Sequence, residues 1–487
     1  MNDDERLLAH VRPGDWRNPE PASLYDLVVI GGGTAGLVCA AGAAGLGARV
    51  AIIERARLGG DCLNTGCVPS KALLHAARAI HDARHAGSAG VAITARVDFA
   101  AVMDSVRARR ADLAPHDSAQ RLTSIGVDVF LGEASFAGRS RIAVGGRELP
   151  FHRAVIATGG RPAIPPVPGL SNLRSLTSEN IFNLREQPRS LLVIGGGPIG
   201  CELAQAFALL GTGVTLVESA ARLLPREDPD ASAIVARRLA ADGVRVMTGA
   251  SIRGVAQTGA QIRATLETGE VPADAVLVAV GRSPTTEGLN LDAAGVACSH
   301  RGVTVDDRLR TSNRRIFAAG DICSSYQFTH AADAMARIVI QNALFHGRRR
   351  ASALVIPWAT YTFPEVAHVG PPPYEAARLG AECLTVQLTD VDRAVIDADA
   401  DGFLRIHHQR GRILAATLVA PHASELIGQV ASLMRRGRAL DEFSSDIFPY
   451  PTVADVLRRA GDAYRRTRLT PRAKAVLTRY FAVMRKL

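Results

Sequence analysis

Short apolar runs, each followed by a helical pattern, recur along the chain and predict buried strands. The first run is Leu27-Val28-Val29-Ile30, and an alanine-rich stretch from Leu37 to Leu46 with helical periodicity follows it. A second predicted strand, Arg49 to Ile53, ends at Glu54. Short continuous apolar runs are typical of parallel strands that are covered on both faces. The pattern therefore predicts a strand–helix–strand unit.

The same pattern returns later in the chain. Leu191-Leu192-Val193-Ile194 is followed by a predicted helix from about Cys201 to Leu210 and by a predicted strand from Gly213 to Val217, which ends at Glu218. No uninterrupted apolar run reaches about 18 residues, so we expect no membrane span.

Both units carry glycine at the turn between strand and helix: Gly31-Gly32-Gly33-Thr34-Ala35-Gly36 and Gly195-Gly196-Gly197-Pro198-Ile199-Gly200. This is the G-x-G-x-x-G pattern of dinucleotide sites, with the pyrophosphate at the helix N-terminus and an acidic residue near the ribose. Two such units predict two dinucleotides, one a flavin and one a nicotinamide, each bound by a Rossmann-like domain of an α/β fold.

Glu218 bears on the choice of nicotinamide nucleotide. A carboxylate at the end of the second strand accepts from the 2′-OH of NAD and repels the 2′-phosphate of NADP. Arg222 and Arg226 follow closely and could weaken that preference. We expect NADH to be favoured.

Cys62 and Cys67 lie five positions apart, between the first unit and a predicted helix. Pro69 suits the first turn of that helix, which continues with helical periodicity from Ala72 to Ile80. A thiol near a helix N-terminus is stabilised as a thiolate, and Lys71 adds positive charge. Two buried structural cysteines are the alternative interpretation. A zinc site needs two further ligands at suitable spacing, and none occurs nearby.

Composition narrows the class of protein. The chain has 487 residues, which is enough for two to four domains, and seven cysteines, an odd number that disfavours a secreted disulfide framework. Residues 1–12 lack an apolar signal-peptide core, so we expect a cytoplasmic protein. The net charge of +10 favours anionic ligands, but with 5% aromatic residues and no stacking motif we expect no nucleic-acid partner.

The sequence from Gly60 to Lys71 matches G-x-C-x-N-x-G-C-x-P-S-K, a motif of the pyridine nucleotide-disulfide oxidoreductases. Ala157-Thr158-Gly159, Gly281-Arg282 and Ala319-Gly320-Asp321 match further family motifs. Over about residues 25–465 the chain resembles this family, which includes glutathione reductase, dihydrolipoamide dehydrogenase and mercuric reductase. The resemblance implies a third, C-terminal α+β dimerisation domain and a homodimer whose active sites each use both subunits.

The resemblance also implies residue roles. Cys67 would be the flavin-proximal thiol and Cys62 the thiol that attacks the substrate, with Lys71 near the flavin N5 and paired with Glu202. Ile199 would replace the tyrosine that covers the flavin in many relatives. The implied FAD-binding residues are Gly31, Gly33, Thr34, Ala35, Gly36, Glu54, Arg55, Gly60, Asp61, Cys62, Lys71, Ala134, Ala157, Thr158, Gly159, Arg282, Asp321 (at the ribityl chain) and Ala331. The implied NAD(P)-binding residues are Gly195, Gly197, Ile199, Gly200, Glu218, Val280 and Gly281.

Tyr450 and Asp455 depart from the pattern of two branches of the family. In the glutathione reductase and lipoamide dehydrogenase branches a histidine and a glutamate occupy these positions, and the histidine is the acid/base for the interchange thiol. A tyrosine has a pKa near 10 and is a poor base at neutral pH. We expect disulfide turnover to fall by roughly 10²–10⁴-fold, unless a histidine elsewhere takes the role. The candidates are His330, His368, His407 and His422.

With a tyrosine at this position, the chain resembles mercuric reductase. We therefore expect electrons to pass from NAD(P)H through FAD to Cys62 and Cys67, and then to a disulfide or to a thiol-bound metal such as Hg(II), for which thiolates are suitable ligands. Residues 1–25 and 460–487 contain no cysteine, so a metal ion would go directly to the pair. A dihydrolipoamide dehydrogenase, a redox-sensing flavoprotein of low turnover, and a flavin oxidase or quinone reductase are the alternatives.

The family layout predicts the limits of the domains. An N-terminal extension at 1–24 precedes an FAD domain at 25–160 and 284–352, an NAD(P) domain at 161–283 and an interface domain at 353–465. The tail, 466–487, predicts a basic amphipathic helix that starts with Thr470 as N-cap and Pro471 at its first position. Its apolar residues, at helical spacing, are Ala473, Val476, Leu477, Tyr480, Phe481, Met484 and Leu487. The helix could pack on its own subunit or on the dimer partner, or it could lie on a membrane surface.

Overall fold

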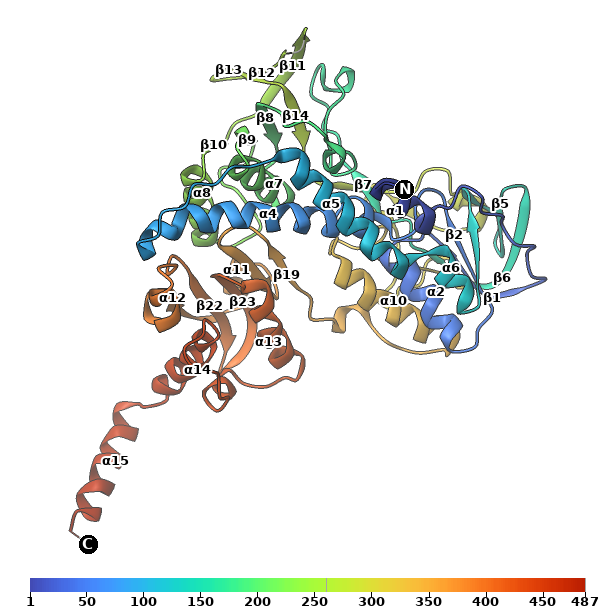
Figure 1. Cartoon of the computed structure of the whole chain (residues 1–487). Helices are drawn as coiled ribbons and strands as arrows, with labels where there is room; N and C mark the ends of the chain where they lie inside the picture. The colour runs from blue at the N-terminus through green and yellow to red at the C-terminus, as the bar shows by residue number, and fades with distance from the viewer. Residues whose placement is uncertain (260, 487) are drawn as a thin grey trace. The chain divides into compact units, whose positions relative to one another are not determined.

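The computed structural model describes residues 1–259 and 261–486 and divides into two compact units (Figure 1). The first unit comprises Met1–Ala86, Ala92–Val217 and Ala250–Leu354, and the second comprises Gly87–Val91, Glu218–Gly249 and Val355–Leu487.

A seven-stranded sheet forms the centre of the first unit. Its middle strand, β1 (Tyr25–Ile30), is buried at Leu27, Val28, Val29 and Ile30 and pairs in parallel with β2 and β6. The strand order is β3-β2-β1-β6-β5-β4, and β18 also pairs with β6 in parallel. The other strands are β2 (Val50–Glu54), β3 (Val127–Leu131), β4 (Ala134–Gly138), β5 (Arg141–Val144), β6 (Arg147–Ile156) and β18 (Ile316–Ala318).

Helices α2 (Thr34–Gly45) and α10 (Thr329–Leu344) lie side by side (Figure 1) and share a hydrophobic core with one face of this sheet. Their contact is close, because a Cβ at Gly42 of α2 would lie 2.7 Å from the Ile340 side chain of α10. The same unit contains α1 (Asp3–Val11), α3 (Gly60–Asn64), α4 (Cys67–His85), α5 (Phe99–Leu113), α6 (Ala119–Ser124) and α9 (Leu291–Ala294).

The second predicted strand–helix–strand unit is also present. Strand β8 (Ser190–Ile194) pairs in parallel with β9 (Gly213–Glu218) and with β14 (Ala275–Val278), and α7 (Pro198–Leu209) joins β8 to β9. The remaining strands of the first unit are β7 (Gly160–Pro162), β11 (Ile252–Thr258), β12 (Gln261–Leu266), β13 (Gly269–Ala273), β15 (Arg282–Pro284), β16 (Cys298–Ser299) and β17 (Gly302–Val303). The α/β fold with two dinucleotide-type units is therefore confirmed.

Both helices that follow the glycine turns begin three residues earlier than the apolar pattern predicted. Helix α2 begins at Thr34 and not Leu37, and α7 begins at Pro198 and not Cys201. The third glycine of each turn, Gly33 or Gly197, is the N-cap, so the chain enters the helix directly from the turn. The free N–H groups at the start of each helix are consequently close to the glycine turn.

The second unit contains a five-stranded antiparallel sheet with the order β19-β20-β23-β22-β21. Helices α13 (Ala423–Arg435) and α14 (Asp455–Thr467) contribute to its hydrophobic core. The strands are β19 (Pro357–Thr360), β20 (Glu365–Val369), β21 (Glu382–Gln387), β22 (Phe403–Gln409) and β23 (Arg412–Ala420). The unit also holds α8 (Pro229–Ala241), β10 (Val244–Thr248), α11 (Pro373–Arg378), α12 (Asp392–Ile396) and α15 (Pro471–Met484). Within residues 1–259 and 261–486, no helix is long and apolar enough to cross a membrane.

Candidate functional site

The first glycine loop has the backbone geometry of a phosphate site. Gly31, at φ +105°, donates from its N–H to the Ile53 carbonyl at 2.8 Å, which places β1 and β2 at the start of the loop. A Cβ at Gly36 would lie 1.8 Å from the carbonyl oxygen of Gly31, so only glycine permits this close approach of helix and strand. The N-terminus of α2 therefore presents backbone N–H groups to an anion.

The loop meets α3 through a second glycine contact. A Cβ at Gly60, which has φ +54°, would lie 2.5 Å from Cα of Gly33, so a side chain there would fill the space beside the loop. The two backbones instead form a cradle free of side chains at the start of α2. Such a cradle fits the pyrophosphate of a dinucleotide such as FAD.

Glu54, at the end of β2, is buried, and its carboxylate accepts from the backbone N–H of Gly32 at 2.6 Å and of Ala56 at 2.5 Å. Burial raises the pKa of this carboxyl group. The hydrogen bond between Glu54 and Gly32 fixes the conformation of the glycine loop. Glu54 is also the acidic residue at the position expected for the ribose. The adjacent Arg55 is exposed.

Arg282 ties together three segments of the predicted FAD region. Its guanidinium donates to the carboxylate of Asp61, to Asp321 at 3.2 Å and to the Gly160 carbonyl at 2.5 Å. Burial raises the pKa of Asp321. Nearby, the Thr158 hydroxyl donates to the Thr285 carbonyl at 2.7 Å. Other predicted FAD residues lie on neighbouring elements. Ala157 and Gly159 follow β6, Ala134 is the first residue of β4, and Ala331 is a buried residue of α10.

The second glycine loop repeats this geometry. The Gly195 N–H donates to the Val217 carbonyl at 2.8 Å, and a Cβ at Gly200 would lie 1.9 Å from the carbonyl oxygen of Gly195. Ile199 and Val280 are exposed although apolar. These features fit a second dinucleotide.

Glu218 is the last residue of β9, and its Oε1 accepts from the backbone N–H of Ala220 at 2.7 Å. Arg222 donates to the carbonyls of Pro225 at 2.9 Å and Glu227 at 3.3 Å. The guanidinium of Arg222 is thus engaged with its own loop, and Arg226 is the exposed arginine of this segment.

The two predicted redox cysteines lie on consecutive helices. Cys62 lies in α3, a short helix that the apolar pattern did not predict, and Cys67 is the first residue of α4. Both are free thiols, and each thiol influences the acidity of the other. The Thr329 hydroxyl, at the first position of α10, lies 3.2 Å from Sγ of Cys67.

The two thiols differ in acidity. The hydrogen bond from Cys62, the Thr329 hydroxyl and the charge of Lys71 lower the pKa of Cys67 to about 6, against the opposing effect of burial. The same hydrogen bond and burial raise the pKa of Cys62. At neutral pH roughly nine-tenths of Cys67 is therefore thiolate, while Cys62 keeps its proton.

Lys71 is held beside the pair by Glu202 of α7, with a distance of 2.8 Å between Nζ and Oε2. Glu202 is buried, and a buried carboxylate is unfavourable without a partner of opposite charge. The ion pair implied by the family resemblance is present.

The loop between the cysteines is fixed by Asn64, which sequence reasoning missed. Its side-chain amide donates to the carbonyls of Leu58 at 3.0 Å and Gly60 at 2.8 Å. Arg110, which is almost fully buried, donates to the Asn64 carbonyl at 3.1 Å. These bonds fix the C-terminal end of α3, the helix that carries Cys62.

Replacing Lys71 by methionine is expected to raise the pKa of Cys67, because the thiolate loses a neighbouring positive charge and still faces Glu202. A thiolate forms as pH rises through its pKa, so at pH 6 alkylation of reduced Cys67 should slow by roughly tenfold. Mass spectrometry after iodoacetamide treatment at several pH values measures this rate for each cysteine. Lys474→Met is the matched control, and an unchanged pH profile for Lys71→Met would contradict the assignment.

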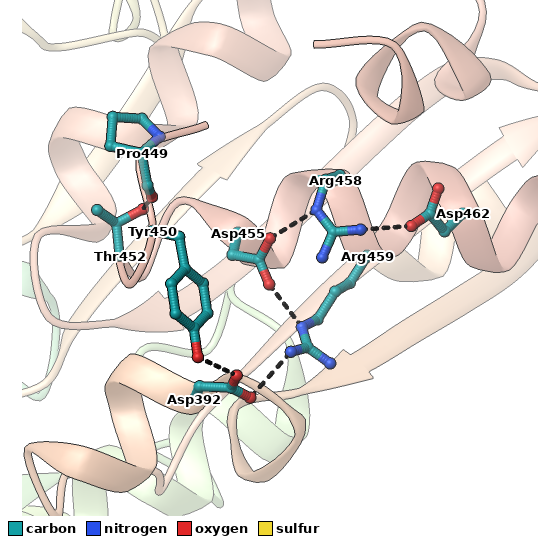
Figure 2. A network of polar contacts seen from close by, with 8 residues as sticks. All are labelled: Asp392, Pro449, Tyr450, Thr452, Asp455, Arg458, Arg459 and Asp462. Carbon is teal, nitrogen blue, oxygen red and sulfur yellow. Dashed lines mark hydrogen bonds and ion pairs between the residues drawn. The ribbon is translucent and has the colours of Figure 1, made fainter. Parts of the chain in front are cut away.

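A polar network surrounds Tyr450 in the second unit (Figure 2). The Tyr450 hydroxyl is exposed and donates to Asp392 of α12 at 2.9 Å, and this hydrogen bond raises the pKa of the phenol. Arg459 bridges Asp392 at 3.0 Å and Asp455 at 2.7 Å. Tyr450 therefore keeps its proton at neutral pH, as the sequence predicted, and Asp392 is a partner that the sequence did not indicate.

Asp455 is bound by two arginines of its own helix, Arg458 and Arg459, each at 2.7 Å. Although partial burial opposes the shift, these bonds lower the pKa of Asp455, so its carboxylate is ionised. Its bonding partners are thus the arginines and not the hydroxyl of Tyr450 (Figure 2).

The alternative histidines have different environments. His368 is fully buried between the Thr417 hydroxyl at 2.8 Å and the Pro371 carbonyl at 3.1 Å, and burial lowers its pKa to about 4. Burial also lowers the pKa of His407. His422 precedes α13 as its N-cap residue, and His330 is exposed and stacks on Phe328. A structural role accounts for His368, whereas His330 directly follows Thr329, the residue at Cys67.

Among residues 1–259 and 261–486, no cluster of three or more His, Cys, Asp or Glu side chains is arranged to hold a metal ion.

Comparison with known proteins gives two family matches. The pyridine nucleotide-disulphide oxidoreductase model matches residues 25–336, and the dimerisation-domain model of the same family matches residues 356–460. A mercuric reductase of Staphylococcus aureus is 34% identical over 446 residues, which is 90% of this chain and 82% of the relative. A dihydrolipoyl dehydrogenase of Chlamydia muridarum is 35% identical over 450 residues, which is 89% of this chain and 95% of the relative.

Solved structures show the same architecture. The Cu(II) complex of RclA, an HOCl-induced flavoprotein disulfide reductase of Escherichia coli, superposes with a TM-score of 0.80 at 30% identity and covers 89% of this chain and 98% of its own. LpdA of Mycobacterium tuberculosis superposes with a TM-score of 0.81 at 28% identity, over 90% of this chain and 99% of its own. From these matches and the two glycine loops beside the cysteine pair, the chain belongs to the pyridine nucleotide-disulphide oxidoreductase family.

Proposed function

We propose that this chain is an NAD(P)H-dependent flavin disulfide reductase of the mercuric reductase-like type, which reduces a disulfide or a thiol-bound metal ion through Cys62 and Cys67. The unequal acidity of the pair carries the proposal. A thiolate at Cys67 and a protonated thiol at Cys62 are the two forms that a disulfide yields when it takes up two electrons and one proton. A pair of structural cysteines has no need of this asymmetry.

FAD, held by the first glycine loop, would supply two-electron transfer between NAD(P)H and the pair. Lys71 stabilises the negative charge on Cys67, and Glu202 holds Lys71 in place. With a disulfide substrate, the dithiol returns to the disulfide and the substrate leaves as two thiols. With Hg(II), NAD(P)H and the ion give NAD(P)⁺, a proton and the metal.

The protonated thiol of Cys62 favours a metal substrate over a disulfide. A thiol must lose its proton before it attacks a disulfide, and Tyr450 is a poor base because its bond to Asp392 raises the pKa of the phenol. A soft metal ion displaces the thiol proton itself when it binds. The mercuric reductases among the relatives support a soft metal ion as substrate, and the Cu(II) complex of RclA is an example of metal binding by a flavoprotein disulfide reductase.

We also propose that NADH is preferred over NADPH and that the active form is a homodimer. Glu218 places a carboxylate at the predicted ribose position, and the nearby Arg222 is engaged with its own loop. The dimerisation domain at residues 356–460 supports the homodimer. The family resemblance implies that each site then uses residues of both subunits.

A comparison of substrates tests the proposal. The purified yellow protein is assayed anaerobically with NADH and with NADPH on Hg(II) in excess thiol, on lipoamide, on glutathione disulfide and on a quinone. We expect kcat/KM for the thiol-bound metal to exceed that for either disulfide by at least about 10²-fold, because only the disulfides need a base. NADH is expected to give the higher kcat/KM.

Alkylation before and after NADH supplies a readout other than turnover. Iodoacetamide should label Cys67, the thiolate of the pair, only after NADH is added, since two electrons open the disulfide. Quinone turnover without opening of the disulfide would overturn the dithiol proposal. Efficient oxidation of dihydrolipoamide by NAD⁺ would instead establish a dihydrolipoamide dehydrogenase, for which the relative at 35% identity is the supporting observation.

A further inference from the structure

Helix α15 (Pro471–Met484) exposes a continuous apolar face. Its large apolar side chains are between 44% and 66% exposed, and none of its described residues is buried. The sequence left open that this helix packs on its own subunit or on the dimer partner, and in the described part of the single chain no other element buries it. The exposed residues are Val476, Leu477, Tyr480, Phe481, Val483 and Met484; Leu487, which the sequence placed with them, lies outside the described residues.

The helix is defined by its own sequence. Thr470 is the N-cap, and its side-chain oxygen accepts from the Ala473 N–H at 3.2 Å, while Pro471 occupies the first turn. An isolated helix of this length is marginally stable in water, so most of its stability must come from burial of its apolar face. Something must therefore cover that face.

Basic residues border the apolar face on both sides. At 3.6 residues per turn, Arg472 and Arg479 lie along one border, and Lys474 and Arg485 lie along the other. No ion pair involves any of these four side chains within the described part of the chain. Long basic side chains can extend from the border of an apolar face to phosphate groups while their methylenes stay in the apolar layer.

All charged residues of the C-terminal tail have the same sign. After Asp462 the sequence contains no Asp or Glu, and all eight charged residues are basic. These residues are Arg465, Arg466, Arg468, Arg472, Lys474, Arg479, Arg485 and Lys486.

This distribution distinguishes the possible occupants. A second α15 would bring like charges together, and the family's dimerisation match ends at residue 460, before the helix begins. An anionic lipid surface instead takes up the apolar face and the bordering charges at once, and Tyr480 and Phe481 are side chains of the kind enriched at that depth.

We propose that α15 lies on an anionic phospholipid surface, with its apolar face in the acyl boundary and Arg472, Lys474, Arg479 and Arg485 at the lipid phosphates. This placement attaches the second unit to a membrane surface without a spanning segment. The proposal does not depend on the substrate of the reductase.

Flotation of the full-length, FAD-loaded protein tests the proposal. Vesicles of phosphatidylcholine with phosphatidylglycerol should carry the protein upward, whereas vesicles of phosphatidylcholine alone should carry little. Salt should weaken binding, and each of Lys474→Gln and Arg479→Gln should lower the partition coefficient by about fivefold. Failure to bind the anionic vesicles at low salt would overturn the proposal.

Matched variants separate the apolar face from net charge. Val476→Glu lies on the apolar face and Ala475→Glu on the opposite side, and both side chains are exposed, so both variants should fold and keep their flavin. Val476→Glu is expected to lower the partition coefficient at least tenfold more than Ala475→Glu. Equal losses would mean that charge alone binds the vesicles and would overturn the lipid-surface geometry.

Two further measurements address the other occupants. A chain ending at Arg468 should keep its oligomeric state in sedimentation velocity, its flavin content and its NADH-dependent turnover while losing vesicle binding. A change of oligomeric state would assign the apolar face to a second copy. Binding of duplex DNA as strong as that of anionic vesicles at equal phosphate concentration, and unaffected by Val476→Glu, would also overturn the proposal.

Discussion

Replacing Cys67 by alanine is expected to abolish NADH-dependent reduction of both disulfides and thiol-bound metal ions, with a loss of about 10⁴-fold or more in kcat. The effect is large because the variant has neither a disulfide to accept two electrons nor a second thiolate for a metal ion. Removing Cys62 should have a similar effect, since the two sulfur atoms act as one unit. Anaerobic NADH oxidation, followed with Hg(II) in excess thiol and with lipoamide, measures the loss.

Cys298→Ala and Cys383→Ala are the matched controls, because both remove an exposed thiol that lies outside the pair. They should retain full turnover. Equal flavin content in all variants shows that the FAD region is intact. Turnover of Cys67→Ala within tenfold of wild type would show that the electrons bypass the pair.

The sequence predicted those parts of the fold that are determined by residues close together in the chain. The two glycine turns, their strands and Cys67 at a helix start all lie within short segments, so spacing and residue type suffice. Helix starts were less well predicted, because glycine at the third position lets the helix begin inside the turn, as at Thr34. The short helix that carries Cys62 shows no apolar periodicity because it has only five residues, of which Leu63 belongs to the hydrophobic core.

Contacts between distant residues were beyond sequence reasoning. Thr329 reaches Cys67 across 262 positions, and Asp392 reaches Tyr450 across 58. Nothing in the local sequence of either residue marks it, because a hydroxyl at a helix start or a carboxylate after a turn is common. The resemblance supplied Lys71–Glu202, which is a family pattern, but it could not supply Asp392 as the partner of a tyrosine that replaces the histidine of the glutathione reductase and lipoamide dehydrogenase branches.

The hydrogen bond between Tyr450 and Asp392 makes the tyrosine a weaker base than the histidine that other branches of the family have at this position. A tyrosine beside a carboxylate is a hydrogen-bond donor and gives up its proton reluctantly, whereas a histidine in the same place could donate one ring N–H to Asp392 and offer the other nitrogen as a base. Asp392 would then fix the tautomer of that histidine. The network is therefore already suited to support a base, although the chain carries no base at this position.

Replacing Tyr450 by histidine is expected to raise turnover of lipoamide and glutathione disulfide by about 10- to 100-fold, which is part of what general base catalysis contributes. The pH dependence should change as well. The neutral imidazole is the base and predominates above its pKa of about 6.5, so disulfide turnover should rise as pH increases through that value and then level off. Wild type should lack this step, because the pKa of Tyr450 is raised above its ordinary value.

The histidine variant should have little effect on metal reduction, because a soft metal ion displaces the thiol proton without a base. Tyr450→Phe is the matched control: it keeps the ring, removes the hydroxyl and should leave metal turnover within a few-fold of wild type. The double variant Tyr450→His/Asp392→Asn should lose part of the gain, since the carboxylate no longer orients the imidazole. If disulfide turnover of wild type already equals that of Tyr450→His, the base lies elsewhere, and a loss in His330→Asn would place it on α10 beside Thr329.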